Sequence, residues 1–505
     1  MQFRRFDPTE AKASHNTRHS DHVPVWRSVH RAGFGLGIDL LRSIENRTRV
    51  VWRKLDVGQT NLTRIPQEVA VPGLRRPILA LLSIMFFLRI VAQYLQSNRE
   101  IAGLPAFEHW HSETMSYPVL LGLQIAILGV MVLIVWKAEA IKSRQRLGVA
   151  LKGLAVLYTL AMLVRMTIGL FNLSSANWFD GAVSTAFHFV LAAFLLTLGS
   201  MLTANTPSKW WGKSARVVVR YAAYPALIVF GYAMFVWLRD TGAPLLFSSY
   251  LSTLLGLIGI ILHETLAPAR AEWRPVLKEV VQDGLFVAIV QIGVPATLKA
   301  LTLVLLVRVS QFDVTTKSGI WPHDAPVLVQ IMLMLIVAEF FRYWIHRSLH
   351  VYGPLWKLHA VHHASDKLYT INVGRFHPFD KAIQFFGDTA PFLLLGVNAE
   401  VFAAYFVLYA INGFYQHSNA DVRLGFLNYL IAGPELHRWH HSAKISEANA
   451  NYGNNLIVWD TVFGTRFLPN DREVGRIGIG NQNWPNGFLA QLSAPFTTPT
   501  DTSDR

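Results

Sequence analysis

The chain has 505 residues, of which 52% are hydrophobic and 15% charged; soluble domains carry about 25% charged residues, so this composition indicates a membrane protein. It contains no cysteine, which excludes disulfides, thiolate metal sites, iron–sulfur clusters and a cysteine nucleophile. The net charge of +14 does not predict nucleic-acid binding, because half of the excess lies in residues 1–76, ahead of the first apolar segment.

Residues 1–76 are predicted to form a basic cytoplasmic segment. They hold 14 Lys and Arg against 7 Asp and Glu. Their polar beginning lacks the apolar core of a cleavable signal peptide. Residues 25–51 mix apolar and basic side chains, a composition that fits either a helix on the membrane surface or a partly ordered basic tail.

Eight apolar runs follow, each near the length of about 20 residues that a membrane-spanning helix needs. Basic loops follow the second, fourth and sixth runs, whereas the loop after the first is acidic. Basic loops are expected in the cytoplasm, so eight crossings return the chain to the cytoplasm at His346. The runs lie at roughly 77–95, 118–136, 148–170, 182–203, 216–237, 245–263, 282–307 and 326–345.

Residues 412–469 mix polar and aromatic side chains and are predicted to form a cytoplasmic cap. An apolar stretch at 383–411 is interrupted by Gly, Pro and Asp, which predicts a helical hairpin that dips into the membrane and returns. The predicted fold is all-α: a polytopic helical membrane protein with a histidine-rich cap. Its parts are the basic segment 1–76, a six-helix region of unassigned role at 77–265, a catalytic region at 266–470 and an irregular tail at 471–505.

Eight histidines fall into three clusters on this cytoplasmic side. Spacings of three and four residues place side chains on one face of a helix, and neutral imidazole is a common ligand for transition metals. Eight imidazoles suggest two ions, and ligand type alone leaves iron, copper, nickel and zinc open. The clusters are H-R-S-L-H (His346, His350), H-A-V-H-H (His359, His362, His363) and H-R-W-H-H (His437, His440, His441).

With their flanks, these clusters resemble the fatty acid hydroxylase/sterol desaturase superfamily of integral-membrane di-iron enzymes. The similarity runs from about Glu339 to Pro469 and includes R-F-H-P, Q-H-S-N, E-L-H-R-W-H-H-S and N-Y-G-N-N-L-I-V-W-D-T-V-F-G-T. It implies two iron ions, dioxygen as co-substrate and a lipid substrate. Some relatives carry further histidine ligands between the second and third boxes, which makes His417 and, less directly, His377 additional candidates.

Three residues within these motifs are candidates to contact the ligand residues and hold them in place without binding the metal: Asp460, Asn419 and Arg375. Asp460 is expected to orient an imidazole, and Arg375 to contact a lipid head group or a carboxylate. Electrons are expected from a separate ferredoxin, cytochrome or pterin, because the chain shows no G-x-G-x-x-G motif in a strand–helix context and no cysteine.

The resemblance implies a membrane-bound oxygenase acting on C–H bonds of a fatty acyl, sterol or ether lipid. Hydroxylation is favoured over desaturation, because oxygen transfer is the simpler outcome at an oxidising metal centre. The alternative is a histidine-rich, metal-binding transporter or lipid-binding protein without oxygenase activity. The absence of cysteine, and a C-terminus unlike an endoplasmic-reticulum retrieval signal, favour a bacterial inner membrane.

Overall fold

The computed structural model describes residues 75–110, 115–173, 181–203, 213–310, 320–480 and 484–497. Within these ranges every regular element is a helix, and β structure is limited to three isolated bridges. The all-α prediction is therefore confirmed. The basic segment predicted at 1–76, with its surface helix at 25–51, lies outside the described residues apart from Arg75 and Arg76.

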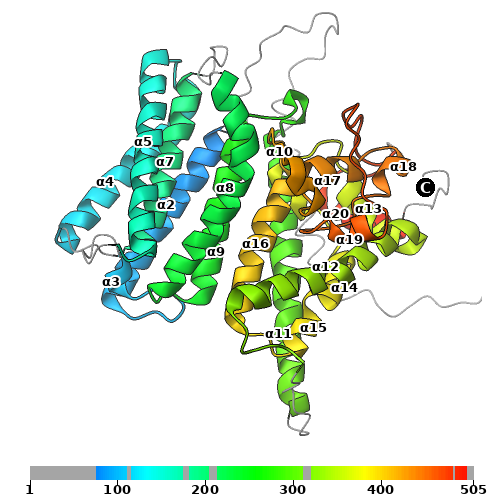
Figure 1. Ribbon diagram of the computed structural model, residues 1–505. Coiled ribbons are helices and arrows are strands. Elements are labelled where there is room, and N and C mark those ends of the chain that lie inside the picture. The colour runs from blue at the N-terminus through cyan, green and yellow to red at the C-terminus, as the bar shows by residue number, and fades with distance from the viewer. Residues whose placement is uncertain are drawn as a thin grey trace, which may run out of the picture. The chain divides into compact units, whose positions relative to one another are not determined.

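Eight helices in the described part of the chain are long and apolar enough to cross a membrane, and they coincide with the eight predicted runs. The seventh is continuous from α10 through a π-helical stretch, η3, into α11 (Figure 1). The eight are α2 (Arg75–Asn98), α4 (Tyr117–Trp136), α5 (Gln145–Leu170), α7 (Ala182–Leu202), α8 (Lys213–Asp240), α9 (Leu245–Leu266), α10–η3–α11 (Leu277–Leu285, Phe286–Gly293, Val294–Ser310) and α12 (Val327–Val351).

The first four spans share an apolar core with the short α3 (Phe107–Trp110) and with residues of α8 and α9. α5 and α7 approach closely at two glycines: a Cβ on Gly148 would lie 2.8 Å from the carbonyl oxygen of Gly199, and the reverse distance is also 2.8 Å. Small residues of this kind allow helix backbones to pack tightly in membranes.

The fifth and sixth spans, which belong to that core, also pack against α16 (Ala399–His417), a helix of the catalytic region. Ile411 of α16 fills the space left by two glycines, since a Cβ on Gly231 or Gly256 would lie 2.2 or 2.8 Å from its Cδ1. His263 Nδ1 lies 3.0 Å from the hydroxyl of Tyr415. A single core therefore extends across residue 265, the boundary drawn from the sequence.

The predicted hairpin at 383–411 is formed by α14 (Pro378–Asp388), α15 (Ala390–Leu394) and the returning α16; α14 and α16 pack against α12, and α15 packs against α14 and α11. Asp388 pairs with Arg342 of α12 at 2.7 Å, and both side chains are buried. The buried acid of the hairpin is thus paired with a cation of the neighbouring helix, as a buried charge requires.

Short helices close the cap: α13 (Gly353–His363), η4 (Thr370–Gly374), η5 (Gly425–Tyr429), α17 (Pro434–His440), α18 (Ile445–Ala448) and α19 (Val458–Val462), with η1 (Ala138–Ala140) and η2 (Ala271–Trp273) in earlier loops. The tail differs from the irregular segment expected, because it contains α20 (Phe488–Thr497). Phe488 of α20 packs edge-on against Phe286, with ring centroids 4.7 Å apart. Tertiary packing stabilises this helix, whose Gly- and Pro-rich surroundings obscure it in the sequence.

Candidate metal centre

Nine buried histidines form two groups at the C-terminal end of α12. Within each group the nitrogens available to a metal all lie within 4.8 Å of one another. We call them the five-histidine group (His346, His350, His359, His363, His440) and the four-histidine group (His362, His417, His437, His441). All eight box histidines are included, together with His417.

Helical spacing explains how the boxes are divided. The pair at positions i and i+4 on α12 turns wholly into the five-histidine group. The second box contributes His359 and His363 to that group and His362 to the other. The third contributes only His440 to the first group, while the last residue of α16 completes the second. Two of the three boxes therefore serve both groups.

The ring orientations in the five-histidine group favour a cation. His346 donates its Nδ1 proton to the carbonyl oxygen of Tyr452 at 2.7 Å, and His359 donates its own to Asp380 at 2.8 Å. A neutral imidazole carries a single proton, so the two Nε2 atoms, 3.0 Å apart, face each other as lone pairs. That arrangement is repulsive unless a cation lies between them.

The same pattern recurs in the four-histidine group. His362 donates Nδ1–H to the carbonyl oxygen of Arg375 at 3.1 Å, and His417 donates to Asn372 Oδ1 at 2.9 Å. Their Nε2 atoms then meet at 3.3 Å. In addition, three buried ring nitrogens have no hydrogen-bond partner among the described residues: His350 Nε2, His437 Nδ1 and His441 Nδ1. The residues present thus fit a metal site in both groups.

Burial and, to a lesser degree, the neighbouring imidazoles lower the pKa of four rings well below the usual value: His362, His363, His437 and His441. Burial also lowers the pKa of His417 and His440 to about 3. The rings are therefore neutral and ready to bind metal at neutral pH.

These depressed pKa values predict acid sensitivity of the metal-free protein. Unfolded histidines take up protons near pH 6.5, whereas the folded rings have pKa values well below that pH, about 3 for His417 and His440. The unfolded state then binds more protons in this window, so stability should decline as the pH falls below about 6.5. Thermal unfolding of chelator-treated protein between about pH 7.5 and pH 5 tests this; a melting temperature independent of pH would contradict it.

The side chains of the three candidate supporting residues bond to the backbone or to another side chain rather than to the histidine rings. Asp460 accepts hydrogen bonds from the backbone N–H groups of Tyr452 and Gly453, both at 2.8 Å, and so holds the loop whose carbonyl meets His346. Arg375 contributes its backbone carbonyl to His362, while its guanidinium pairs with Asp283. The side chain of Asn419 makes its hydrogen bonds to the backbone of Arg270.

His377 lies outside both groups. Its Nδ1 accepts the N–H of Phe379 at the start of α14, and its Nε2 lies 3.2 Å from the carbonyl oxygen of Leu492 in α20. This histidine therefore caps one helix and docks another.

Sequence reasoning missed the side chains that touch the rings directly. These are Asp380 on His359, Asn372 on His417 and Asn449 on His350, the last at 3.1 Å. Asp380 follows R-F-H-P-F, and its place in the first turn of α14 was the available signal. Asn372 lies in the short η4 and Asn449 in the loop after α18, and neither belongs to a periodic pattern.

Gly374 allows the π-helical stretch to approach this site. A Cβ on Gly374 would lie 2.5 Å from Val287 Cγ2 and 2.9 Å from the backbone nitrogen of Val287. Gly374→Ala should therefore separate η3 from η4, shift the carbonyl of Arg375 that holds His362, and cost about 1–3 kcal/mol. Thermal unfolding and metal content measure both effects. Gly284→Ala, where a Cβ meets open space, is the matched control; equal behaviour of the two variants would contradict this account.

Comparison with known proteins agrees with the geometry. Residues 331–465 match the fatty acid hydroxylase family. The ornithine lipid hydroxylase OlsE of Rhizobium tropici is 36% identical over 251 residues, which cover 49% of this chain and 74% of that protein. The human alkylglycerol monooxygenase is 28% identical over 27% of this chain and 30% of its own length.

A rice very-long-chain aldehyde decarbonylase, GL1-8, is 27% identical over 28% of this chain and 54% of its own length. No solved structure matches the chain. Because the similarity to OlsE extends over three-quarters of that protein and the histidine boxes form two buried groups that fit a metal, the chain belongs to the fatty acid hydroxylase/sterol desaturase superfamily.

Proposed function

We propose that the protein is a membrane-bound, non-haem di-iron oxygenase that hydroxylates a membrane lipid. The observation that carries the proposal is the pair of buried histidine groups, five rings and four, each turned toward its own centre. Two nitrogen-rich sites side by side suit a pair of iron ions. The similarity to a lipid hydroxylase and to a monooxygenase supports oxygen transfer over desaturation.

A pair of iron ions, when bound, would supply the dioxygen activation and C–H oxidation that amino acid side chains lack. The protein's own part is to hold the rings through their Nδ1 contacts and to keep water away, since every ligand ring is buried. One oxygen atom would enter the lipid and the other would leave as water, which requires two electrons and two protons from a separate ferredoxin, cytochrome or pterin.

We further propose a bacterial inner membrane as the location, with the histidine groups on the cytoplasmic side. The basic loops after the second, fourth and sixth spans support this orientation. It lets a lipid enter from the bilayer while a cytoplasmic donor delivers electrons. An ornithine lipid is the first substrate to test, given the similarity to OlsE.

Lipid mass spectrometry of cells with and without the protein tests the reaction. The expected result is a lipid that gains one oxygen atom, labelled when the cells grow under ¹⁸O₂, and that is missing in cells expressing His440→Ala. Loss of two hydrogen atoms would instead indicate desaturation. An unchanged lipid profile together with purified protein free of transition metal would contradict the proposal.

A further inference from the structure

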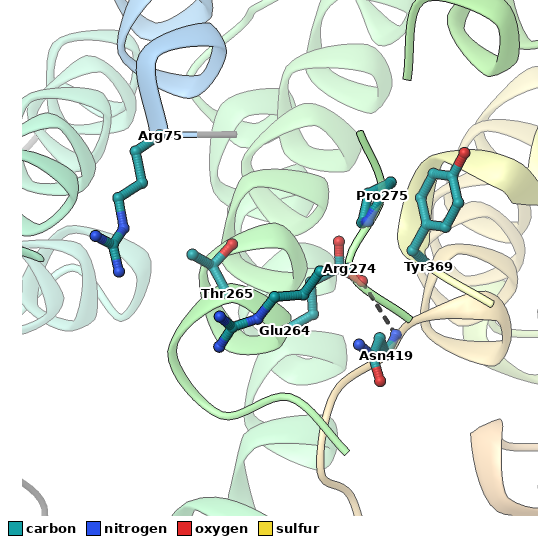
Figure 2. Close-up of a pocket in the computed structure, with 7 residues that line it drawn as sticks. All are labelled: Arg75, Glu264, Thr265, Arg274, Pro275, Tyr369 and Asn419. Atoms are coloured by element: carbon teal, nitrogen blue, oxygen red, sulfur yellow. Dashed lines mark hydrogen bonds between the residues drawn. The ribbon is translucent and has the colours of Figure 1, made fainter. Parts of the chain in front are cut away.

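A small cleft, with a volume of about 40 Å³, lies where the N-terminal spans meet the catalytic region (Figure 2). Its walls come from the first residue of α2, the last turn of α9, the loop after η2, and the segments that follow α13 and α16. The lining residues are Arg75, Glu264, Thr265, Arg274, Pro275, Tyr369 and Asn419.

Two of these side chains are cations without a partner. Neither Arg75 nor Arg274 forms a hydrogen bond or ion pair through its guanidinium with any residue that the structure describes, and the two lie close enough to repel each other. Figure 2 shows Arg274 extending toward Thr265, on the side of the cleft where Arg75 lies. A guanidinium group binds a carboxylate or a phosphate through two parallel hydrogen bonds.

The one carboxylate among these lining residues already accepts hydrogen bonds from the backbone. Glu264 Oε2 accepts the backbone N–H groups of Thr370 and Asn419, each at 3.0 Å. This acid fixes the floor of the cleft, and the two arginines remain available to an incoming anion.

The floor is also joined to the metal centre. Asn419 follows His417 by two residues, and Thr370 precedes by two residues the Asn372 that holds the His417 ring. Two residues span at most about 7 Å, so the cleft lies beside the four-histidine group.

The depth of the cleft matches lipid head groups. Arg75 begins the first span, and Glu264 lies in the last turn of the sixth. Successive crossings place the start of α2, the end of α9 and the end of α12 on one side of the membrane, the side that carries the histidines. A group at the ends of the spans meets the polar layer of the bilayer.

We propose that this cleft binds the anionic group, carboxylate or phosphate, of the substrate lipid's head group, with Arg75 and Arg274 as the residues that select it. The inference rests on the proposed lipid hydroxylase function, because it concerns how that substrate is recognised. It gives the end of α9 a role: this helix forms one wall of the cleft while Glu264 ties the cleft to the His417 loop.

Binding can be tested without turnover. The purified full-length protein in detergent is titrated with N-palmitoylglycine, which carries a carboxylate, with phosphatidylglycerol, with the neutral methyl ester of N-palmitoylglycine, and with inorganic phosphate. We expect both anionic lipids to bind and the ester and free phosphate to bind at least about tenfold more weakly, a difference of about 1.4 kcal/mol. Free phosphate binding as tightly as the lipids would replace the lipid proposal with a soluble anion.

Variants of the two arginines test whether the anionic lipids bind at the cleft. The double variant Arg75→Gln/Arg274→Gln should bind the anionic lipids about tenfold more weakly, while Arg75→Lys/Arg274→Lys, which keeps the charge but not the paired donors, should fall between it and the wild type. Arg76→Gln is the matched control, because Arg76 neighbours Arg75 but pairs with Glu139 outside the cleft. Equal lipid binding by the wild type and both double variants would overturn the proposal.

Turnover measurements then show whether the lipid bound in the cleft is the substrate or a different lipid. With the lipid that the wild type hydroxylates, the glutamine double variant should show a raised KM, little change in kcat and unchanged metal content. Weakened binding with an unchanged KM would overturn the substrate assignment. If no lipid is hydroxylated at all, the proposed function fails, whereas the binding titration still decides whether the cleft holds an anionic lipid.

Discussion

Replacing His417 with alanine should remove the metal held by the four-histidine group and abolish lipid oxidation. This ring supplies one of four nitrogens at that centre, and its Nε2 faces that of His362 at 3.3 Å. Without it three imidazoles remain and a buried gap opens among them. Metal analysis of the purified variant, together with lipid mass spectrometry, measures the loss.

His377→Ala provides the contrast, because His377 lies between the same two boxes in the sequence but outside both groups. It should keep the metal content and lose only about 1 kcal/mol of stability, the usual effect of removing a helix cap. Loss of metal from His377→Ala, or its full retention by His417→Ala, would contradict the assignment of ligands.

Replacing Asp380 with alanine should weaken metal binding in the five-histidine group by about 10–100-fold. Asp380 is fully buried and accepts the Nδ1 proton of His359 at 2.8 Å, which keeps Nε2 free for the metal. Without this acceptor the ring is free to rotate or to carry its proton on the wrong nitrogen. The rate of metal loss to a chelator, compared with the wild type, gives the size of the effect.

Asp380→Asn should have the smaller effect, since an amide oxygen still accepts the proton although the negative charge is gone. Glu400→Gln is the control, because Glu400 pairs with Arg239 at the other end of α16 and contacts no histidine. If all three variants released metal at the wild-type rate, the carboxylate of Asp380 would have no role in holding the site.

Much of the architecture followed from local rules. Eight apolar runs of sufficient length predicted eight spanning helices, because a helix in lipid must satisfy its backbone internally and cover itself with apolar side chains. The histidine spacing likewise predicted a shared metal site, since residues three and four apart lie on one helical face. The short helix α20 was missed, because its stability comes from packing against Phe286 rather than from its own pattern.

The histidine boxes were visible in the sequence, but their division between two centres was not. His359 and His362 lie on one short helix, three residues apart, yet they belong to different groups. Which centre each ring reaches depends on how α12, α13 and α17 cross. Crossing angles arise from side-chain packing between helices, and no single segment encodes them.

The sequence by itself determined the apolar spans and the eight box histidines, because length, hydropathy and spacing are properties of single segments, and the resemblance of its motifs indicated the superfamily. Only the tertiary structure decided that His417 joins the site while His377 does not, that Asp380 and Asn372 hold ligand rings, and that α8 and α9 support α16. These results depend on contacts between residues distant in the chain, which form only when the whole core is packed.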